Sequence, residues 1–325
     1  MQRITLKWLP VFVLMSGIAK ADLDTALVER AQKGNVYAQF NLGIKYSTGN
    51  NVQQNSAEAA KWFRKAADQG FTRAQFKLGL MYSNGDGVPR DMVEAAKWVR
   101  KAAEQGYAEA QVILAVAYTS GEGVPKDDAE AMKWIRKAAD QGYAKAQLLL
   151  AVAYASGAEV PQDYGEAVKW YRKAADQGEA EAQYYLGIAY ATGNAVPQDH
   201  IEAVKWFSKA AGQGESNAQY NLGVMYSEGK GVPRDNGEAV KWYRKAAMQG
   251  HALAQGNLGS MYFNGDGVAK DLVEGLAWIN IGAASGSKKF IQNRETAERF
   301  LGREAILAAQ QRSKEILKEI EATKR

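Results

Sequence analysis

The sequence repeats every 36 residues, seven times, and no insertion or deletion interrupts the period. A tyrosine series from Tyr46 to Tyr262 and a glycine series from Gly34 to Gly286 keep this spacing. The tryptophans that mark it are Trp62, Trp98, Trp134, Trp170, Trp206, Trp242 and Trp278. Such a period is typical of a solenoid, in which each unit must stack on its neighbours to bury its apolar face. The chain is therefore predicted to form one all-α, α/α superhelical solenoid of seven helix-turn-helix repeats.

Each unit begins with a predicted amphipathic helix, which we name its first helix. In the sixth unit, residues 215–250, Ala218, Leu222 and Tyr226 lie four residues apart and so fall on one helical face. The glycine-rich stretch at 229–231 then ends the helix, because glycine favours turns and permits positive φ.

A second helix follows, and its start resembles a capping box. The Asp235 side chain is expected to accept from the amide three residues on, while Glu238 reaches back to the Asp235 amide. Gly250 is expected to end the helix in the left-handed conformation. The same pair of residues opens the second helix of every unit: Asn55/Glu58, Asp91/Glu94, Asp127/Glu130, Asp163/Glu166, Asp199/Glu202, Asp235/Glu238 and Asp271/Glu274.

The N-terminal 21 residues read as a secretory signal peptide. Arg3 and Lys7 precede the short apolar run 9–18, and Ala19-Lys20-Ala21 is a suitable cleavage site. The alternative, a membrane anchor, is disfavoured because about 20 apolar residues are needed to span a bilayer. We expect a cleaved signal at 1–21 and a periplasmic or secreted protein that does not span the membrane.

Three further segments are predicted for the mature chain. They are an N-terminal capping helix at 22–34, the seven repeats at 35–286, and C-terminal capping helices at 287–325. Cleavage would leave 38 basic and 36 acidic residues, and the array shows no basic stripe of the kind that nucleic acid requires. The chain contains no cysteine, which excludes disulfides and thiolate chemistry.

The repeated residues resemble those of the Sel1-like repeat family, which is related to the tetratricopeptide repeats. In the second unit the family pattern appears as Ala74, Leu78-Gly79, Tyr82, Gly85, Gly87-Val88, Asp91, Ala95, Trp98, Ala102-Ala103 and Gly106. The resemblance covers residues 35–286, with small departures such as alanine for glycine at Ala115 and Ala151. It implies an adaptor or binding surface, and exported bacterial relatives act in envelope assembly, signalling and host contact. Some of them are cysteine-rich and have been linked to β-lactams, an activity that this cysteine-free chain is not expected to share.

No catalytic, cofactor or metal site is predicted. His200 and His251 have no partner at a metal-binding spacing, and we interpret both as surface residues. The two Asn-Gly-Asp-Gly loops at 84–87 and 264–267 lack the later ligands of a calcium loop. Carboxylate pairs are explained by capping and by pairing with a lysine three residues on. The chain is therefore predicted to be a non-enzymatic protein without cofactors.

Function is expected where the repeats differ, on the outward positions of the first helices. Counted from the repeated leucine, position −1 is polar in the outer repeats and apolar in the middle ones, and contiguous apolar surface usually marks an interaction site. By analogy with tetratricopeptide arrays, these positions line a concave groove. The predicted partner-binding residues are Lys77, Ile113, Leu149, Tyr185, Asn221 and Asn257 at position −1, with Glu109, Lys145, Glu181, Tyr184 and Tyr220 beside them.

The sequence thus favours a monomeric, exported scaffold that binds a protein or peptide in this groove, as an extended segment or an amphipathic helix. Two alternatives stay open. Tyr184, Tyr185 and Tyr220 could instead stack on a cell-envelope glycan such as peptidoglycan. The chain could also be a cell-wall or β-lactam-acting hydrolase.

Overall fold

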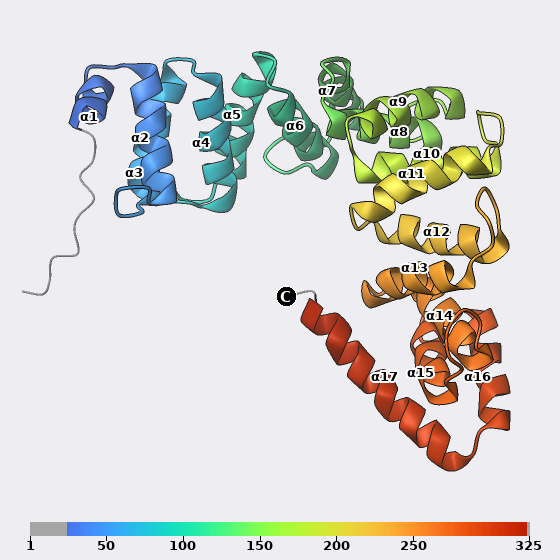
Figure 1. The fold of residues 1–325 in the computed structure, drawn as a ribbon. Helices are drawn as coiled ribbons and strands as arrows, with labels where there is room; N and C mark the ends of the chain where they lie inside the picture. The colour runs from blue at the N-terminus through green and yellow to red at the C-terminus, as the bar shows by residue number, and fades with distance from the viewer. Residues whose placement is uncertain (1–24, 324–325) are drawn as a thin grey trace, which may run out of the picture. The chain divides into compact units, whose positions relative to one another are not determined.

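The protein is all-helical throughout residues 25–323, the part that the computed structural model describes (Figure 1). Each repeat contributes two antiparallel helices, as predicted, and no strand occurs among the described residues. The first helices are α2 (Val36–Thr48), α4 (Thr72–Asn84), α6 (Ala108–Ser120), α8 (Ala144–Ser156), α10 (Ala180–Thr192), α12 (Ser216–Glu228) and α14 (Ala252–Asn264). The second helices are α3 (Ser56–Asp68), α5 (Met92–Glu104), α7 (Asp128–Asp140), α9 (Tyr164–Asp176), α11 (His200–Gly212), α13 (Asn236–Met248) and α15 (Leu272–Ala283).

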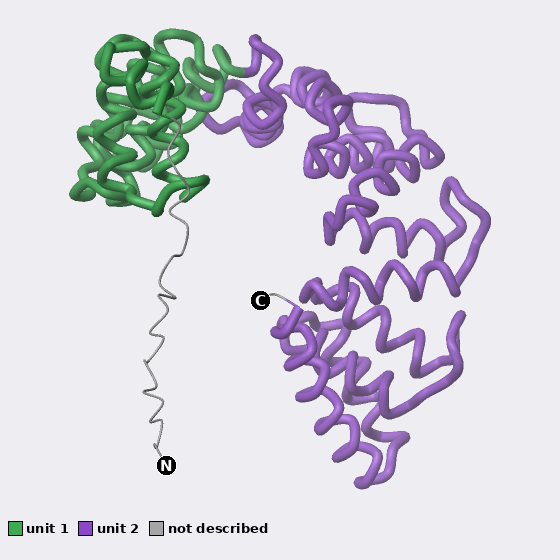
Figure 2. The backbone as a smooth tube through the Cα atoms, turned by 60° about the vertical axis from the view of Figure 1, so that its left-hand side comes forward, with its two compact units in different colours: residues 1–138 green, residues 139–325 purple. Residues whose placement is uncertain are grey.

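Three more helices lie outside the repeats: α1 (Thr25–Gln32), α16 (Lys288–Phe300) and α17 (Arg303–Thr323). The chain divides into two compact units, residues 1–138 and 139–325, with the division inside α7 (Figure 2). The predicted signal peptide at 1–21 lies outside the described residues. Within the described helices, none is long and apolar enough to cross a membrane.

Of the two hydrogen bonds predicted for each capping box, only one forms. In every repeat the Asn or Asp side chain accepts from the backbone amide of the glutamate three residues on, at 2.9–3.0 Å. The expected return bond from the glutamate does not form. The amide of Asp235 donates instead to the Tyr226 carbonyl, and the same bond recurs in the other repeats. The backbone carbonyl of the repeated tyrosine, near the end of the first helix, therefore takes the place expected for the glutamate side chain.

The glutamates that do not bind the cap amide pair with lysines instead. Six of them accept from the lysine three residues on, at 2.5–2.9 Å, which confirms the predicted pairs. Such exposed pairs contribute only a few tenths of a kcal/mol each. A second row of lysines lies over the repeated tryptophan rings, with the Lys173 Nζ 3.8 Å from the centre of the Trp170 ring. Both rows keep the lysines at the surface of the second helices.

The core of each unit is a layer of leucines and small residues. The repeated leucine of each first helix, such as Leu186 or Leu222, is at most 1% exposed. The second helix faces it with alanines that are almost fully buried, among them Ala210 and Ala246. Alternating large and small side chains allow the two helix layers to pack closely.

Among the described residues, a repeated glutamine is the only polar side chain that is buried in each of the seven repeats. Gln183 donates to the Ala175 carbonyl at the end of the preceding second helix, at 3.1 Å. Its own carbonyl accepts from Gln213 at 2.8 Å. These bonds satisfy groups that helix ends leave unpaired, and they join neighbouring repeats.

Glycine in the first helix permits an aromatic ring of the second helix to lie against its backbone. A Cβ atom on Gly187 would be 2.7 Å from the ring of Phe207, and one on Gly223 would be 2.7 Å from the ring of Tyr243. Both distances are shorter than carbon atoms tolerate, so these rings depend on the missing side chain.

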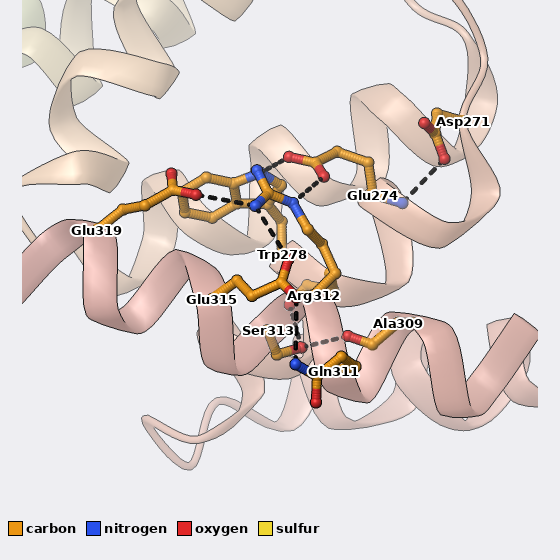
Figure 3. Close-up of polar contacts among 10 residues, drawn as sticks. Asp271, Glu274, Trp278, Ala309, Gln311, Arg312, Ser313, Glu315 and Glu319 are labelled. Atoms are coloured by element: carbon orange, nitrogen blue, oxygen red, sulfur yellow. Dashed lines mark hydrogen bonds and ion pairs between the residues drawn. The ribbon is translucent and has the colours of Figure 1, made fainter.

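Polar contacts join the last helix, α17, to α15 at the end of the array (Figure 3). Arg312 of α17 donates to Glu274 of α15 at 2.9 Å and to Glu319 at 2.8 Å. Glu274 also accepts from the Trp278 indole nitrogen at 2.9 Å, and Ser313 donates to the Ala277 carbonyl at 3.1 Å. A buried face of α17 thereby replaces the repeat that would otherwise follow.

The Gly223→Ala variant should be less stable by about 1–3 kcal/mol, because the added methyl group displaces the Tyr243 ring from a close-packed site. The Gly212→Ala variant is the matched control, since a Cβ there meets no atom within 4 Å. It should be neutral or stabilising by up to about 1 kcal/mol. Urea unfolding measures both, and equal effects at the two positions would contradict this account of the packing.

Candidate binding surface on the first helices

The predicted binding residues lie on the first helices, and their exposure follows their position in the repeat. Glu109, Lys145 and Glu181 at position −5 are exposed. At position −1, Lys77 is exposed, whereas the others are half-buried: Ile113, Leu149, Tyr185, Asn221 and Asn257. Tyr184 and Tyr220 at position −2 are half-buried too. Lys77, Glu109 and Ile113 belong to the first compact unit, and the remainder belong to the second.

Four aromatic rings meet where α9, α10 and α11 pack. Tyr185 stacks on Tyr171 with ring centres 5.0 Å apart and planes at 23°. The ring centre of Tyr184 lies 5.1 Å from that of Tyr185 and 6.2 Å from that of Phe207. Burial, followed by the nearby charges, raises the pKa of Tyr171, Tyr184 and Tyr185, so all three phenols are neutral at physiological pH. Part of each ring is used inside the protein, which leaves less free face for stacking on a sugar.

A second aromatic contact involves a histidine. Tyr220 stacks on His251, with ring centres 4.6 Å apart and planes at 20°. The His251 Nδ1 accepts from the Ala254 amide at 3.2 Å and so caps α14. Both histidines, interpreted from the sequence as surface residues, are partly exposed: His251 is half-buried in this contact, and His200 is half-buried at the start of α11. The stacking and the cap of His251 were not predicted.

The histidine cap favours the neutral imidazole. Burial lowers the pKa of His251 below its ordinary value of 6.5, although the backbone hydrogen bond and the charge of Glu215 oppose this shift. A protonated Nδ1 could no longer accept from the Ala254 amide. In the first repeat the equivalent cap is Asn35, whose side chain accepts from Ala38 at 2.9 Å and does not titrate.

Cavities open on this face at the same register of different repeats. Each lies between the two helices of one repeat and the helix that follows them. In the first compact unit, residues 1–138, the cavity measures about 50 Å³ and is bordered by Leu80, Val99 and Ile113. In the second unit, the cavity among α12, α13 and α14 measures about 340 Å³ and is bordered by Val224, Tyr243 and Asn257 at the equivalent positions.

The larger cavity is polar. It is lined by Tyr220, Val224, Ser227, Glu228, Arg234, Asn236, Tyr243, Asn257, Ser260, Met261, Asp266 and Lys289. Burial raises the pKa of Tyr243 to about 12, and hydrogen bonds with Ser227 and Asn257 oppose the rise. A further cavity of about 230 Å³ shares Ser260 with it and continues toward Asn293 of α16.

The structure brings only part of the predicted set together. Tyr220 and Asn257 share the 340 Å³ cavity, and Tyr184 and Tyr185 share the aromatic contact. The sequence reasoning missed Arg234, Asn236 and Lys289, because it considered only four positions of the first helices. A comparison of positions four repeats apart could have drawn attention to these residues. Arg234 stands at the position of Arg90, Asn236 at that of Met92, and Lys289 at that of Lys145.

The described residues contain no group of three His, Asp or Glu side chains arranged to hold a metal ion. Glu228 in the large cavity pairs with Lys230 at 2.7 Å, and Asp266 accepts from Asn264 at 3.2 Å. What the surface offers is hydrogen-bond donors, cations and half-buried rings, which suit binding.

Stacked helix pairs that present a variable face define a class of proteins, the α/α repeat scaffolds. The Sel1 repeat family model matches seven consecutive segments, 36–71, 72–107, 108–143, 144–179, 180–215, 216–251 and 252–287. This chain therefore belongs to the Sel1 repeat family, whose members are typically scaffolds for protein–protein interaction.

Two solved structures extend the comparison. A Sel1 repeat protein from Oxalobacter formigenes is 39% identical, with 84% of this chain and 79% of that chain covered and a TM-score of 0.67. A protective antigen present in uropathogenic Escherichia coli strains is 30% identical, with coverages of 91% and 87% and a TM-score of 0.38. No curated protein matches the chain.

The pH dependence of stability tests the His251 cap. Below about pH 6.5 the unfolded chain takes up a proton that the folded protein resists, so stability should fall as pH decreases through the lowered pKa. The His251→Asn variant keeps a cap of the Asn35 kind and should lose this part of the fall. Urea unfolding at about pH 7.5 and about pH 5 provides the comparison. Identical losses in the two proteins, or a His251 proton resonance that titrates above 6.5, would contradict the assignment.

Proposed function

We propose that this protein is an exported, non-enzymatic scaffold that binds a protein or peptide partner on the face of its first helices. One observation carries the proposal. Leu149 and Tyr185 occupy position −1 of consecutive first helices and are half-buried, whereas Asn221 and Asn257 stand at the same position in the next two repeats. The fold accepts a polar side chain at this position, so the apolar ones are not needed for stacking.

Interaction surfaces gain most of their binding energy from a few such anchors. A half-buried leucine or tyrosine is held in place by its neighbours and still offers apolar area, which reduces the entropy lost on binding. Exposed Lys145 and Glu181 lie one turn away on the same helices and add opposite charges beside the anchors. This combination suits an amphipathic helix or an extended segment with apolar side chains.

The double variant Leu149→Asn/Tyr185→Asn should fold and should lose partner binding. Asparagine is already present at the equivalent positions of α12 and α14. Loss of two anchors of about 2 kcal/mol each would reduce affinity by two to three orders of magnitude. Crosslinking in the cell envelope followed by purification of the mature protein measures capture, and thermal melting measures folding.

The control for this experiment is Lys169→Asn/Lys205→Asn on the second helices. Both lysines are exposed and form only i,i+3 pairs, with Glu166 and Glu202. Capture by this control should equal that of the wild type. Undiminished capture by a folded Leu149→Asn/Tyr185→Asn protein would refute the assignment, and a collapsed melting transition would place the two residues in the core instead.

Export is the second part of the proposal and rests on the sequence of residues 1–21. Signal cleavage after Ala21 should produce a mature chain that begins at Asp22. Intact-mass measurement of the protein from a periplasmic or culture-medium fraction would show this N-terminus. A product that retains Met1, or that stays with the membrane after a salt wash, would contradict export in this form.

A further inference from the structure

The cavity among α12, α13 and α14 contains an arginine that makes no hydrogen bond or ion pair with any described residue. Four other repeats place a glutamine or an arginine at this loop position, and each donates to a carbonyl near the end of its own first helix. These bonds are Gln54 to Ser47, Arg90 to Ser83, Gln162 to Ala155 and Gln198 to Ala191, at 2.8–3.0 Å. Arg234 makes no equivalent bond, so its five donors are left to the cavity that it lines.

A second cation faces the same cavity. Lys289 of α16 donates to the Asn257 side-chain oxygen at 3.3 Å and has no carboxylate partner within the described part of the chain. Of the two acids on the cavity wall, Glu228 forms an ion pair with Lys230 at 2.7 Å, whereas Asp266 accepts from the neutral Asn264 amide at 3.2 Å and keeps its charge. The cavity therefore contains two cationic groups whose charges its own walls do not pair.

The equivalent cavity in the first unit shows that stacking does not require this chemistry. There Met92, Val99 and Ile113 stand where Asn236, Tyr243 and Asn257 stand in the second unit, and the volume is about 50 Å³ instead of about 340 Å³. The equivalent arginine of that repeat, Arg90, is bound to the Ser83 carbonyl. The polar cavity is thus a local departure from the repeat, and its size falls within the range of ligand sites, about 300–1,000 Å³.

We propose that this cavity binds a carboxylate group of a peptide partner. The planar guanidinium of Arg234 matches a carboxylate with two parallel hydrogen bonds, and Lys289 adds a second positive charge. The side-chain amide of Asn236 also lines the cavity and can bond the adjoining peptide backbone. The neighbouring cavity, which shares Ser260, gives the peptide room to continue toward α16.

The proposal deepens the proposed function and rests on it, since it names the chemistry of one segment of the partner. The carboxylate could be a chain terminus or an acidic side chain. Three short peptides distinguish these sources: N-acetyl-trialanine as the free acid, the same peptide as its amide, and N-acetyl-Ala-Asp-Ala-amide. The full mature protein, labelled with ¹⁵N, is titrated with each to about 20 mM, a range set by the millimolar affinity of so few contacts.

Saturable shifts of the Asn257 and Ser260 amides and of the Arg234 Nε resonance are expected with one or both acidic peptides. The neutral amide should cause none. Shifts with the free acid alone identify a chain terminus, and shifts with the aspartyl peptide alone identify a side chain. Absence of saturable shifts with both acids, or equal shifts with the neutral peptide, would overturn the proposal.

Arg234→Gln should weaken the binding of the acidic peptide at least tenfold, because it removes a charge-assisted pair. Lys289→Gln should weaken it several-fold. Arg90→Gln is the matched control, since Arg90 stands at the same position four repeats earlier and is bound to the Ser83 carbonyl, and it should leave the affinity unchanged. All three side chains are exposed, so the folded spectrum should persist. Equal affinity of the Arg234→Gln protein and the Arg90→Gln protein would overturn the assignment.

The two proposals fail separately. Peptide shifts that persist while no partner is captured would reject the scaffold function and leave the carboxylate site standing. Partner capture without peptide shifts would reject the carboxylate site alone.

Discussion

A buried glutamine amide joins each repeat to the helix before it, and the rest of the array depends on this bond. Gln219 donates to the Ala211 carbonyl at the end of α11 and accepts from Gln249 at the end of α13. An amide buried among leucines and alanines is costly unless its groups are paired, so the bond is formed in one register only. That register fixes the distance from one helix pair to the next. A single inserted residue would leave both the amide and the carbonyl unpaired, which explains a period kept seven times without change.

The repeated residues maintain the fold, and the variable residues supply the chemical variety. The leucines, glycines and alanines form the contact between the helix layers, and the repeated tyrosine carbonyl holds the amide that starts the second helix. These positions vary little between repeats, and the replacements that occur, such as alanine for glycine at Ala115 and Ala151, stay small. Chemical variety is therefore confined to position −1 of the first helix, its neighbours and the connecting loop. There the chain changes from Ile113 and Leu149 to Asn221 and Asn257 while the backbone repeats.

The fold could be predicted from sequence because helical period, caps and glycines all indicate the same structure. The 36-residue spacing located every helix pair, and the capping aspartates accept from the expected amides. The details that failed depend on competition between partners in space. Glu238 was expected to bind the cap amide, but the Tyr226 carbonyl takes that amide and Lys241 takes the carboxylate. The stacking of His251 on Tyr220 gave no sequence signal, since it joins residues of adjacent repeats. Arg234 was overlooked because a free side chain is recognised only when its equivalents are seen to be bound.

The large cavity also has a consequence for how such proteins change over generations. Its walls come from α12 and α13 of one repeat, α14 of the next, and Lys289 beyond them. The site is thus a property of a junction and belongs to no single repeat. Duplication of one 36-residue segment in the gene would preserve every stacking bond and would lengthen the array without harm to its fold. It would not copy the cavity, because the new junction would join a repeat to itself. Recombination between repeats therefore creates new binding chemistry each time it changes the length of the chain, and point substitution is needed only to refine it.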